Sequence, residues 1–401
     1  MTSEIKQRIE QIRRGEVPER YVKTALGLAP TDWKRYTFGD IYTERKEPGD
    51  ENLPLLMVSI HSGVSDGEVD AAELPKQVKR IEDKSQYKKA VSGDLVFNMM
   101  RAWQGAIGTV RTTGMVSPAY IVAEPNDKAY PLFMDYYSRT PQMINQIDRQ
   151  SYGVTDFRKR LYWDSFAPIS CTLPPIAEQR KIAAILTTQD KVIELKEKRL
   201  SEKQRQKKYL MQQLLTGKKR LPGFLKSWKT VELGEIFNYI QPTAYLVKTT
   251  DYDDSYKTPV LTAGKTFILG YTNETEGVFT KVPVVIFDDF TTATKYVDFP
   301  FKVKSSAMKI LTIKDGLSIV FAYEAMQLIK FTVGGHERHW ISKYSCLTID
   351  IPDIEEQTAI AEVLSAADRE IELLQQDIEQ EKQKKKALMQ LLLTGIVRVK
   401  T

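Results

Sequence analysis

Few residues of this chain have the types and spacing of a metal-binding or nucleotide-binding site. His336 and His339 form a His-x-x-His pair with Cys346 nearby, but no second cysteine pair supplies the four ligands of a closed zinc site. Residues 263–266 read Ala-Gly-Lys-Thr, yet Pro259 stands where a phosphate-binding loop needs its first glycine. The residues that follow are typical of a strand and a turn, not of the required helix. We therefore expect neither a metal nor a nucleotide on this chain.

Two further chemistries also lack their signatures. Adenine methyltransferases carry Asn/Asp-Pro-Pro-Tyr/Phe, and the one Pro-Pro of this chain, at Pro174 and Pro175, lies in LPPI. No Asp…Glu-x-Lys arrangement of a nuclease stands in a convincing context. The sequence therefore favours a recognition protein over an enzyme, with no catalytic residues.

Composition places the chain among ordinary globular proteins. It has 401 residues, of which 42% are hydrophobic and 27% are charged, and no run approaches a membrane span of about 18 apolar residues. The first residues are charged and lack the apolar core of a signal peptide. Two cysteines, Cys171 and Cys346, indicate a reducing cytoplasm and no disulfide framework. The net charge of +6 permits a polyanionic partner without proving one.

One segment of the chain occurs twice, and it reads as a long helix. Residues 173–217 align without a gap to residues 351–395, at an offset of 178, with 20 of 45 positions identical. Prolines stand at both starts, glutamates (Glu178, Glu356) fall in the first turns, and glycines close both ends. Such a helix is about 60 Å long, which is typical of a rod or coiled coil.

A heptad stripe of apolar residues predicts how these helices pair. It is interrupted at Lys207 in the first copy and at the equivalent Lys385 in the second. Because neither helix is stable alone, we expect an antiparallel pair related by a pseudo-twofold axis. The alternative is that each helix packs separately on its own domain. The stripe consists of Leu186, Ile193, Leu200 and Leu214, and of Leu364, Ile371, Ile378 and Leu392.

The regions between the helices are rich in short β-type runs, punctuated by Gly, Pro, Asn and Asp. Both open alike, with Trp33-Lys34 before Gly39-Asp40-Ile41 and Trp228-Lys229 before Gly234-Glu235-Ile236, and beyond that they share little. The N-terminus carries a short amphipathic helix, Glu4–Arg14, followed by Gly and Pro, as the first long helix is. The chain therefore reads as nearly circular, with a shared frame and different inserts.

These features resemble the DNA-specificity subunit of type I restriction–modification systems. The match is carried by LPPIAEQRKI and LMQQLLTGKKR, by their second copies, by the Trp-Lys…Gly-Asp-Ile opening and by EIKQRIEQIRRGEVPERY at the start. The resemblance implies an α+β fold with two β-rich target recognition domains, each reading half of a bipartite DNA site, separated by two long helices. On this view residues 1–20 are an arm, 21–172 and 221–348 the two domains, and 173–220 and 349–401 the spacer helices.

The resemblance also implies partners and candidate contacts. We expect double-stranded DNA, two methyltransferase subunits and, through them, restriction subunits; S-adenosylmethionine, ATP and magnesium would belong to those partners. Bases and phosphates are contacted by basic, amide, hydroxyl and aromatic side chains in polar loops. The DNA-binding candidates are Arg101, Trp103, Gln104, Arg149, Gln150, Tyr152 and Arg158 in the first domain, and Lys265, Thr291, Thr292, Thr294, Lys295, Tyr296, His336, Arg338 and His339 in the second.

Two other readings remain open at this point. One is a duplicated, non-catalytic protein-binding scaffold with a coiled-coil rod, which would show no salt-dependent DNA binding. The other is the recognition part of a larger single-chain restriction enzyme, which would need catalytic motifs fused to this chain.

Overall fold

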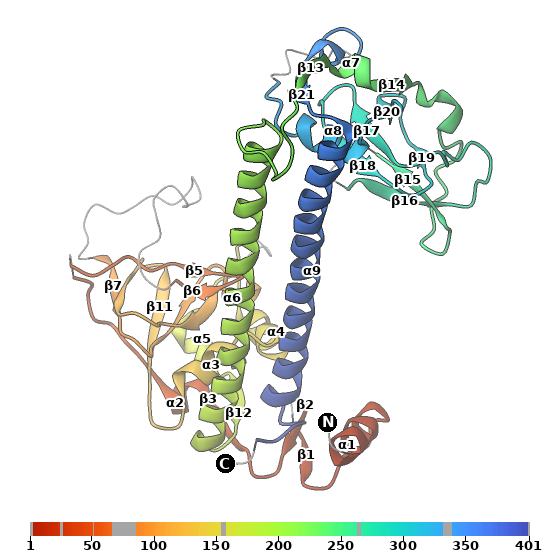
Figure 1. The fold of residues 1–401 in the computed structure, drawn as a ribbon. Coiled ribbons are helices and arrows are strands. Elements are labelled where there is room, and N and C mark those ends of the chain that lie inside the picture. Colours follow the sequence, from red (N-terminus) through yellow and green to blue (C-terminus); the bar gives the residue numbers. More distant parts are fainter. Residues whose placement is uncertain are drawn as a thin grey trace. The chain divides into compact units, whose positions relative to one another are not determined.

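The computed structural model describes residues 3–24, 27–50, 52–65, 86–153, 158–262, 266–331 and 339–399. Contacts divide the chain into two compact units: unit 1 is Met1–Leu195 with Ile378–Thr401, and unit 2 is Lys196–Asp377. The boundaries fall inside the two long helices, α6 (Ile176–Leu214) and α9 (Ile354–Leu393), so each helix gives one half to each unit (Figure 1). No helix in the described ranges is long and apolar enough to cross a membrane.

The two long helices pair antiparallel, as the sequence predicted. In unit 1, Gln189 of α6 donates to Glu381 of α9 at 2.6 Å. In unit 2, Lys203 and Glu370 form an ion pair at 2.8 Å. Residues later in α6 therefore meet residues earlier in α9. The heptad interruptions have the same explanation in both units, because Lys207 pairs with Asp368 at 2.7 Å and Lys385 pairs with Asp190 at 2.5 Å.

The apolar stripe lies largely inside the two units. Leu186 and Leu392 belong to the core of unit 1, and Leu214 and Leu364 belong to the core of unit 2. Ile193 and Ile378 are also buried, whereas Leu200 and Ile371 are half-buried. Burial is therefore repeated at the offset of 178 residues for Leu186 with Leu364 and for Leu214 with Leu392, whereas Ile193 and Ile371, and Leu200 and Ile378, differ in burial.

Unit 1 is built around a four-stranded antiparallel sheet in the order β4-β11-β8-β9. Phe38, Phe97 and Phe166 belong to its core, with the Phe166 ring 4.3 Å from that of Phe38 and 4.6 Å from that of Phe97. The helices and strands of this part are α1 (Ser3–Arg13), β1 (Tyr21–Thr24), β2 (Gly27–Pro30), β3 (Lys34–Thr37), α2 (Phe38–Ile41), β4 (Tyr42–Glu44), β5 (Val58–Ser59), β6 (Gly63–Val64), β7 (Lys88–Ala90), β8 (Leu95–Asn98), η2 (Ala102–Gln104), β9 (Ile107–Thr109), β10 (Gly114–Val116), β11 (Tyr120–Pro125), α3 (Pro131–Tyr137), α4 (Pro141–Gln150), α5 (Trp163–Phe166) and β12 (Ser170–Leu173).

Unit 2 repeats this sheet in the order β14-β20-β17-β18, although the sequences share little. Phe287, Trp340 and Tyr344 pack at its core, with Phe287 5.1 and 4.8 Å from the other two rings. Its elements are β13 (Lys229–Glu232), α7 (Leu233–Ile236), β14 (Phe237–Ile240), η4 (Pro242–Tyr245), β15 (Thr258–Leu261), β16 (Ile268–Thr272), β17 (Val284–Asp288), β18 (Thr294–Val297), β19 (Lys302–Val303), β20 (Met308–Ile313), α8 (Ile319–Met326), η5 (Tyr344–Cys346) and β21 (Thr348–Ile351).

The shared opening of the two regions forms the same local structure in both units. After the Trp-Lys pair the chain forms a strand, β3 or β13, which pairs antiparallel with the last strand before the long helix, β12 or β21. A one-turn helix with a capping box follows each strand, built by Thr37 with Asp40 in unit 1 and by Glu232 with Glu235 in unit 2. The repeated residues are therefore the frame, and the loops of the sheets differ.

The first turn of each long helix holds a buried glutamate that meets an arginine following the other helix. Glu178 is 1% exposed and accepts two hydrogen bonds from Arg398, each of 2.8 Å. Glu356 is also 1% exposed and accepts two from Arg220, each of 2.6 Å. We call these the helix-end pairs. They recur 178 residues apart.

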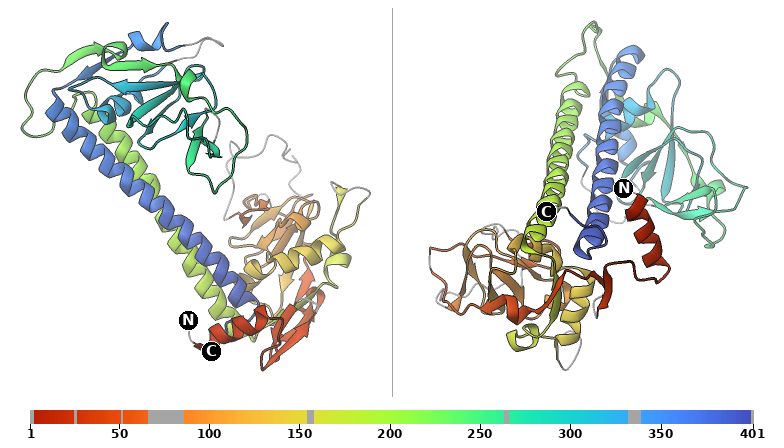
Figure 2. Two further views of the ribbon diagram at one scale, coloured as in Figure 1. Left: turned by 90° about the vertical axis from the view of Figure 1, so that its right-hand side faces the viewer. Right: turned by 90° about the horizontal axis from the view of Figure 1, so that it is seen from below.

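The N-terminal arm lies against the end of α9, as a circular chain requires (Figure 2). Arg8 donates to the carbonyl of Ile396 at 2.9 Å, and the Tyr21 hydroxyl donates to the carbonyl of Gly395 at 2.6 Å. The guanidinium of Arg8 also lies over the Tyr21 ring, 5.3 Å from its centroid. Residues at the start of the chain therefore form hydrogen bonds with the segment that follows α9.

Removing the cation of a helix-end pair should destabilise its unit. We expect Arg398→Ala to lower the free energy of unfolding by about 2 to 4 kcal/mol, and Arg220→Ala to lower it as well, because each leaves a buried carboxylate without its guanidinium. The measurement is urea unfolding followed by circular dichroism. The control is Arg14→Ala, whose ion pair with Glu10 spans 3.6 Å on the surface and should contribute under about 1 kcal/mol. Equal effects of all three substitutions would contradict the role of burial.

Candidate nucleic-acid interface

Three side chains of the loop that follows β8 were predicted to contact DNA. Two of them are exposed to solvent, and the third packs against the core. Arg101 and Gln104 are exposed at the ends of η2, and Trp103 is half-buried against the core of unit 1. The Trp103 Nε1 donates to the carbonyl of Met100 at 3.0 Å, which holds the ring in the loop. Gly105 closes the turn at φ 103°, a backbone conformation that favours glycine. Trp103 therefore supports the loop, while Arg101 and Gln104 are free to reach a ligand.

The second predicted segment of unit 1 lies beside the first, because α4 packs against η2. Arg149 and Gln150 are exposed at the end of α4. Beyond them the backbone of Tyr152 pairs with that of Arg160 through two hydrogen bonds, of 3.1 and 2.9 Å. The Tyr152 side chain is 59% exposed, and its ring lies 5.6 Å from that of Tyr162. The fold thus brings two separate polar segments to one place.

A surface hollow lies between these segments, and we call it the Tyr152 hollow. Arg158 and Arg160 are exposed along it, and in the described part of the chain no carboxylate holds either guanidinium. Lys159, between them, instead pairs with Asp148 at 2.9 Å and lies over the Trp103 ring at 5.5 Å. The hollow is lined by Met100, Tyr152, Gly153, Arg158, Lys159, Arg160 and Tyr162.

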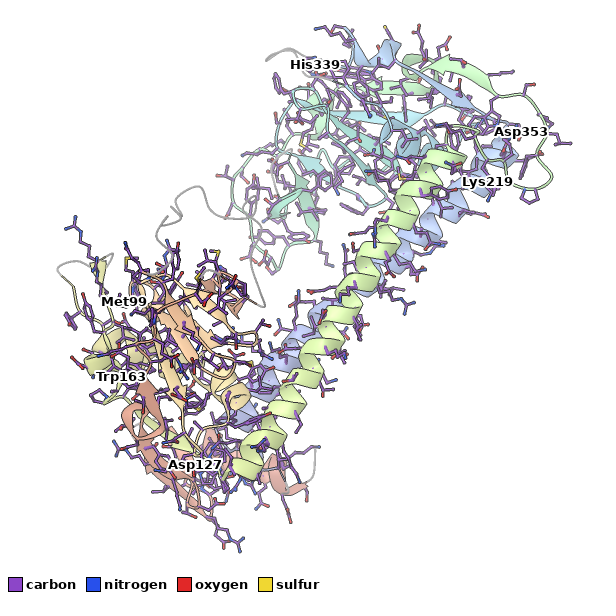
Figure 3. All side chains as sticks on the ribbon, turned by 90° about the vertical axis from the view of Figure 1, so that its left-hand side faces the viewer. Met99, Asp127, Trp163, Lys219, His339 and Asp353 are labelled. Atoms are coloured by element: carbon purple, nitrogen blue, oxygen red, sulfur yellow. The ribbon has the colours of Figure 1, made fainter. Side chains whose placement is uncertain are left out.

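The sequence placed the run Arg158-Lys159-Arg160 behind this loop but kept only Arg158 as a candidate, and it missed Tyr162. The available signal was the alternation of an extended segment, in which residues two apart share a face. Arg158 and Arg160 share the open face, and Lys159 takes the packed one. Met99, labelled in Figure 3, accepts a backbone hydrogen bond of 2.8 Å from Leu161, which ties this segment to the end of β8.

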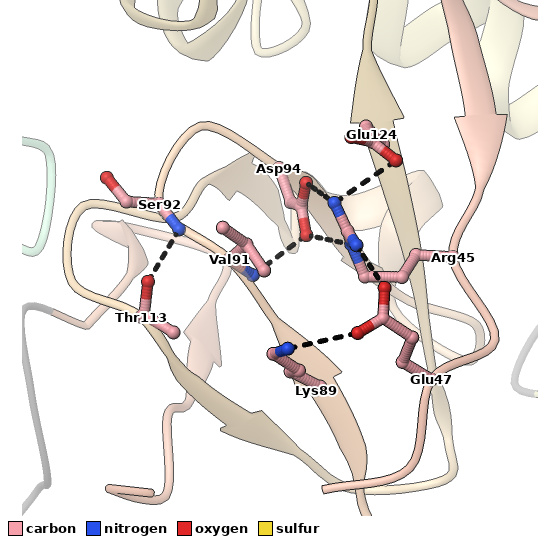
Figure 4. A network of polar contacts seen from close by, with 8 residues as sticks. All are labelled: Arg45, Glu47, Lys89, Val91, Ser92, Asp94, Thr113 and Glu124. Atoms are coloured by element: carbon pink, nitrogen blue, oxygen red, sulfur yellow. Dashed lines mark hydrogen bonds and ion pairs between the residues drawn. The ribbon is translucent and has the colours of Figure 1, made fainter.

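An ion-pair network fixes the opposite end of β8 (Figure 4). Arg45 donates to Asp94 at 2.8 Å, pairs with Glu124 at 3.2 Å and also contacts Glu47. The same carboxylate of Asp94 accepts the backbone N–H of Val91 at 2.8 Å. Burial raises the pKa of Asp94 above its ordinary value, and the hydrogen bond from Arg45 opposes that rise. The network anchors the turn before β8, so the loop after β8 starts from a fixed strand.

In unit 2 the corresponding loop joins β17 to β18. The Asp288 carboxylate accepts hydrogen bonds from the hydroxyl of Thr291 and the N–H of Phe290, at 2.5 and 3.3 Å, which folds the loop back on itself. Thr292 adopts a positive φ of 58° at the turn. Thr291 and Lys295 are exposed, and Thr292 and Thr294 are half-buried. The loop therefore presents hydroxyls and one ammonium group.

Several predicted residues of unit 2 are placed differently or lie outside the described ranges. Tyr296 packs against Tyr323, with ring centroids 6.0 Å apart, so it is a packing residue in this structure. His339 is fully buried, and its ring lies 5.6 Å from that of Phe331, out of reach of a surface ligand. Lys265, His336 and Arg338 lie outside the described residues. Over the ranges that the structure describes, no group of three or more His, Cys, Asp or Glu side chains could hold a metal ion.

Comparisons with known proteins find that this chain is similar to DNA-specificity subunits. Residues 226–383 match the family described as "Type I restriction modification DNA specificity domain". The chain is 55% identical over 140 residues to the EcoR124I/EcoR124II specificity subunit of Escherichia coli, a match that spans 33% of this chain and 34% of that protein. It is 25% identical to the putative MjaX specificity subunit of Methanocaldococcus jannaschii, over 96% of this chain and 98% of that protein.

A solved structure supports the fold across nearly the whole chain. The type I restriction–modification S subunit from M. genitalium superposes with a TM-score of 0.63 at 12% identity, covering 92% of this chain and 97% of that one. At that identity the likeness supports the fold alone. It extends the evidence for a two-domain architecture beyond the segment matched by the E. coli relative.

The three basic residues of the Tyr152 hollow make different contacts, and these contacts predict how much each residue contributes to stability. Lys159→Ala should lower the free energy of unfolding by about 1 kcal/mol, through the lost ion pair and cation–π contact. Arg158→Ala and Arg160→Ala should stay within about 0.5 kcal/mol of the wild type, as exposed residues do. Urea unfolding of the three variants measures this. If either arginine variant lost more stability than Lys159→Ala, Arg158 and Arg160 would not be the residues on the solvent-exposed face.

Proposed function

We propose that the chain is a DNA-specificity subunit of the type I restriction–modification family, and that it binds a bipartite DNA site, one half per unit. The observation that carries the proposal is the repeated sheet. Both units have the same strand order, and in both a polar loop leaves the same strand, after Asn98 in unit 1 and after Asp288 in unit 2. Two units with the same sheet but different loops are suited to binding two different DNA sequences.

In unit 1 the exposed side chains have the chemistry of both kinds of DNA contact. Arg101 can bind guanine through O6 and N7, and Gln104 can bind adenine through N6 and N7. Arg158 and Arg160, which are not held by carboxylates in the described ranges, suit phosphates. Arg149, Gln150 and Tyr152 extend the same surface.

In unit 2 the proposed contacts come from the β17–β18 loop, through Thr291, Thr292, Thr294 and Lys295. Lys265, His336 and Arg338 complete the proposal from outside the described ranges. The buried imidazole of His339 and the packed ring of Tyr296 support the unit from within.

The remaining functions of such a complex are proposed to lie in other chains. This chain would have no catalytic residues, and methyl transfer from S-adenosylmethionine and cleavage driven by ATP and magnesium would belong to its partners. The duplicated helix halves supply two like surfaces, which supports two methyltransferase subunits and, through them, the restriction subunits. A DNA target and two unpaired cysteines, Cys171 and Cys346, favour the cytoplasm.

Two variants of unit 1 separate base contacts from phosphate contacts. The double variant Arg158→Ala/Arg160→Ala should weaken binding to all duplexes alike and reduce the slope of log K against log salt by about 2. Arg101→Ala should cost about 1 to 3 kcal/mol on the cognate site and relax the preference at one position. Fluorescence anisotropy between 50 and 200 mM salt measures both, with the exposed Lys23→Ala as a control. Salt-independent binding, or no binding of duplex DNA, would refute the proposal.

A further inference from the structure

The residue that follows α8 carries a polar side chain in a fixed orientation. Gln327 is exposed, yet its Nε2 donates to Thr294 Oγ1 at 2.7 Å and to the carbonyl of Tyr323 at 3.1 Å. A backbone carbonyl can only accept, so the amide must turn its NH2 group toward Tyr323. Both amide hydrogens are thereby used. The Gln327 Oε1 is left as a bare acceptor on the surface.

Thr294 lies beside Gln327 and offers a hydrogen-bond donor instead of an acceptor. Its hydroxyl oxygen accepts from Gln327, and among the described residues no acceptor takes the hydroxyl hydrogen. A hydroxyl can accept and donate at once. The two side chains therefore offer one acceptor, Gln327 Oε1, beside one donor, the Thr294 hydroxyl.

The base edges of the major groove differ in which of them match such a pair. Adenine shows an acceptor at N7 beside a donor at N6, whereas guanine shows two acceptors and thymine an acceptor beside a methyl group. Cytosine shows the N4 donor alone. We propose that Gln327 and Thr294 together read an adenine in the half-site of unit 2, an inference that rests on the proposed function.

The pair is held rigidly, which limits the entropy lost on binding. Helix α8 begins with the Ser318 side chain as its N-cap and packs against β17 and β18. Its buried Glu324 is fixed by Lys207 of α6 at 3.0 Å. Tyr323, which orients the amide, packs against Tyr296 of β18. The exposed ammonium groups of Lys295 and Lys330, close by in sequence, are of the sign that DNA requires.

The test uses the full chain, purified together with the subunits that accompany it. The protein selects the DNA duplexes that it binds from a pool randomised across the bound site, and the selected duplexes are sequenced. Gln327→Leu removes the acceptor and Thr294→Val removes the donor, both at similar volume. We expect each variant to lose the adenine preference at one shared position by roughly ten-fold or more. All other positions, including the half-site of unit 1, should keep their preferences. The control is Gln376→Leu, an exposed glutamine of α9 whose Nε2 donates to Glu372 at 3.3 Å.

Three results would overturn the inference. One is an unchanged preference in both variants. Another is a uniform loss of affinity across all sequences, which would make the pair a phosphate contact. The third is a lost preference for a base other than adenine. If Gln327→Leu fails to fold, Thr294→Val decides the question alone. A wild-type protein that selects no sequence would refute the proposed function itself, which distinguishes that failure from this one.

Discussion

Each long helix begins with a glutamate that is buried in its own unit, and a buried carboxylate is stable only when a cation is delivered to it. For Glu178 that cation is Arg398, and for Glu356 it is Arg220, each of which follows the end of the opposite helix. An antiparallel pair is required for this, because only then does the end of one helix meet the start of the other. The helix-end pairs therefore tie distant parts of the chain into each unit and leave the sheet loops free to vary.

The repeat made the frame predictable from the sequence, because identical residues at a fixed offset must make equivalent contacts. The heptad stripe predicted the helices and their antiparallel pairing, but not the reason for its interruption. In the sequence, Lys207 and Lys385 only interrupt the row of apolar residues. In the structure they form ion pairs with Asp368 and Asp190. The common strand order of the two sheets was hidden, because strand order follows from pairings between distant segments whose sequences have diverged.

The candidate site was predictable in its location and less so in its membership. Residue type and position after a β-type run pointed to Arg101 and to the β17–β18 loop, and both lie at the surface. Residue type alone could not show that His339 is buried or that Lys159 is engaged while Arg160 is open, since both depend on packing from other segments. Gln327 was not predicted at all. Its significance lies in which amide hydrogens are already used, and that requires the geometry of Thr294 and Tyr323.

The central claim is that two similarly framed units read two half-sites independently. The most direct measurement exchanges residues 221–348 for the matching region of another family member and determines the recognised motif by methylome sequencing. Because the frame of unit 1 and the helix-end pairs are left in place, one half of the motif should change and the other half should persist. A motif that changes in both halves, or in neither, would contradict the account.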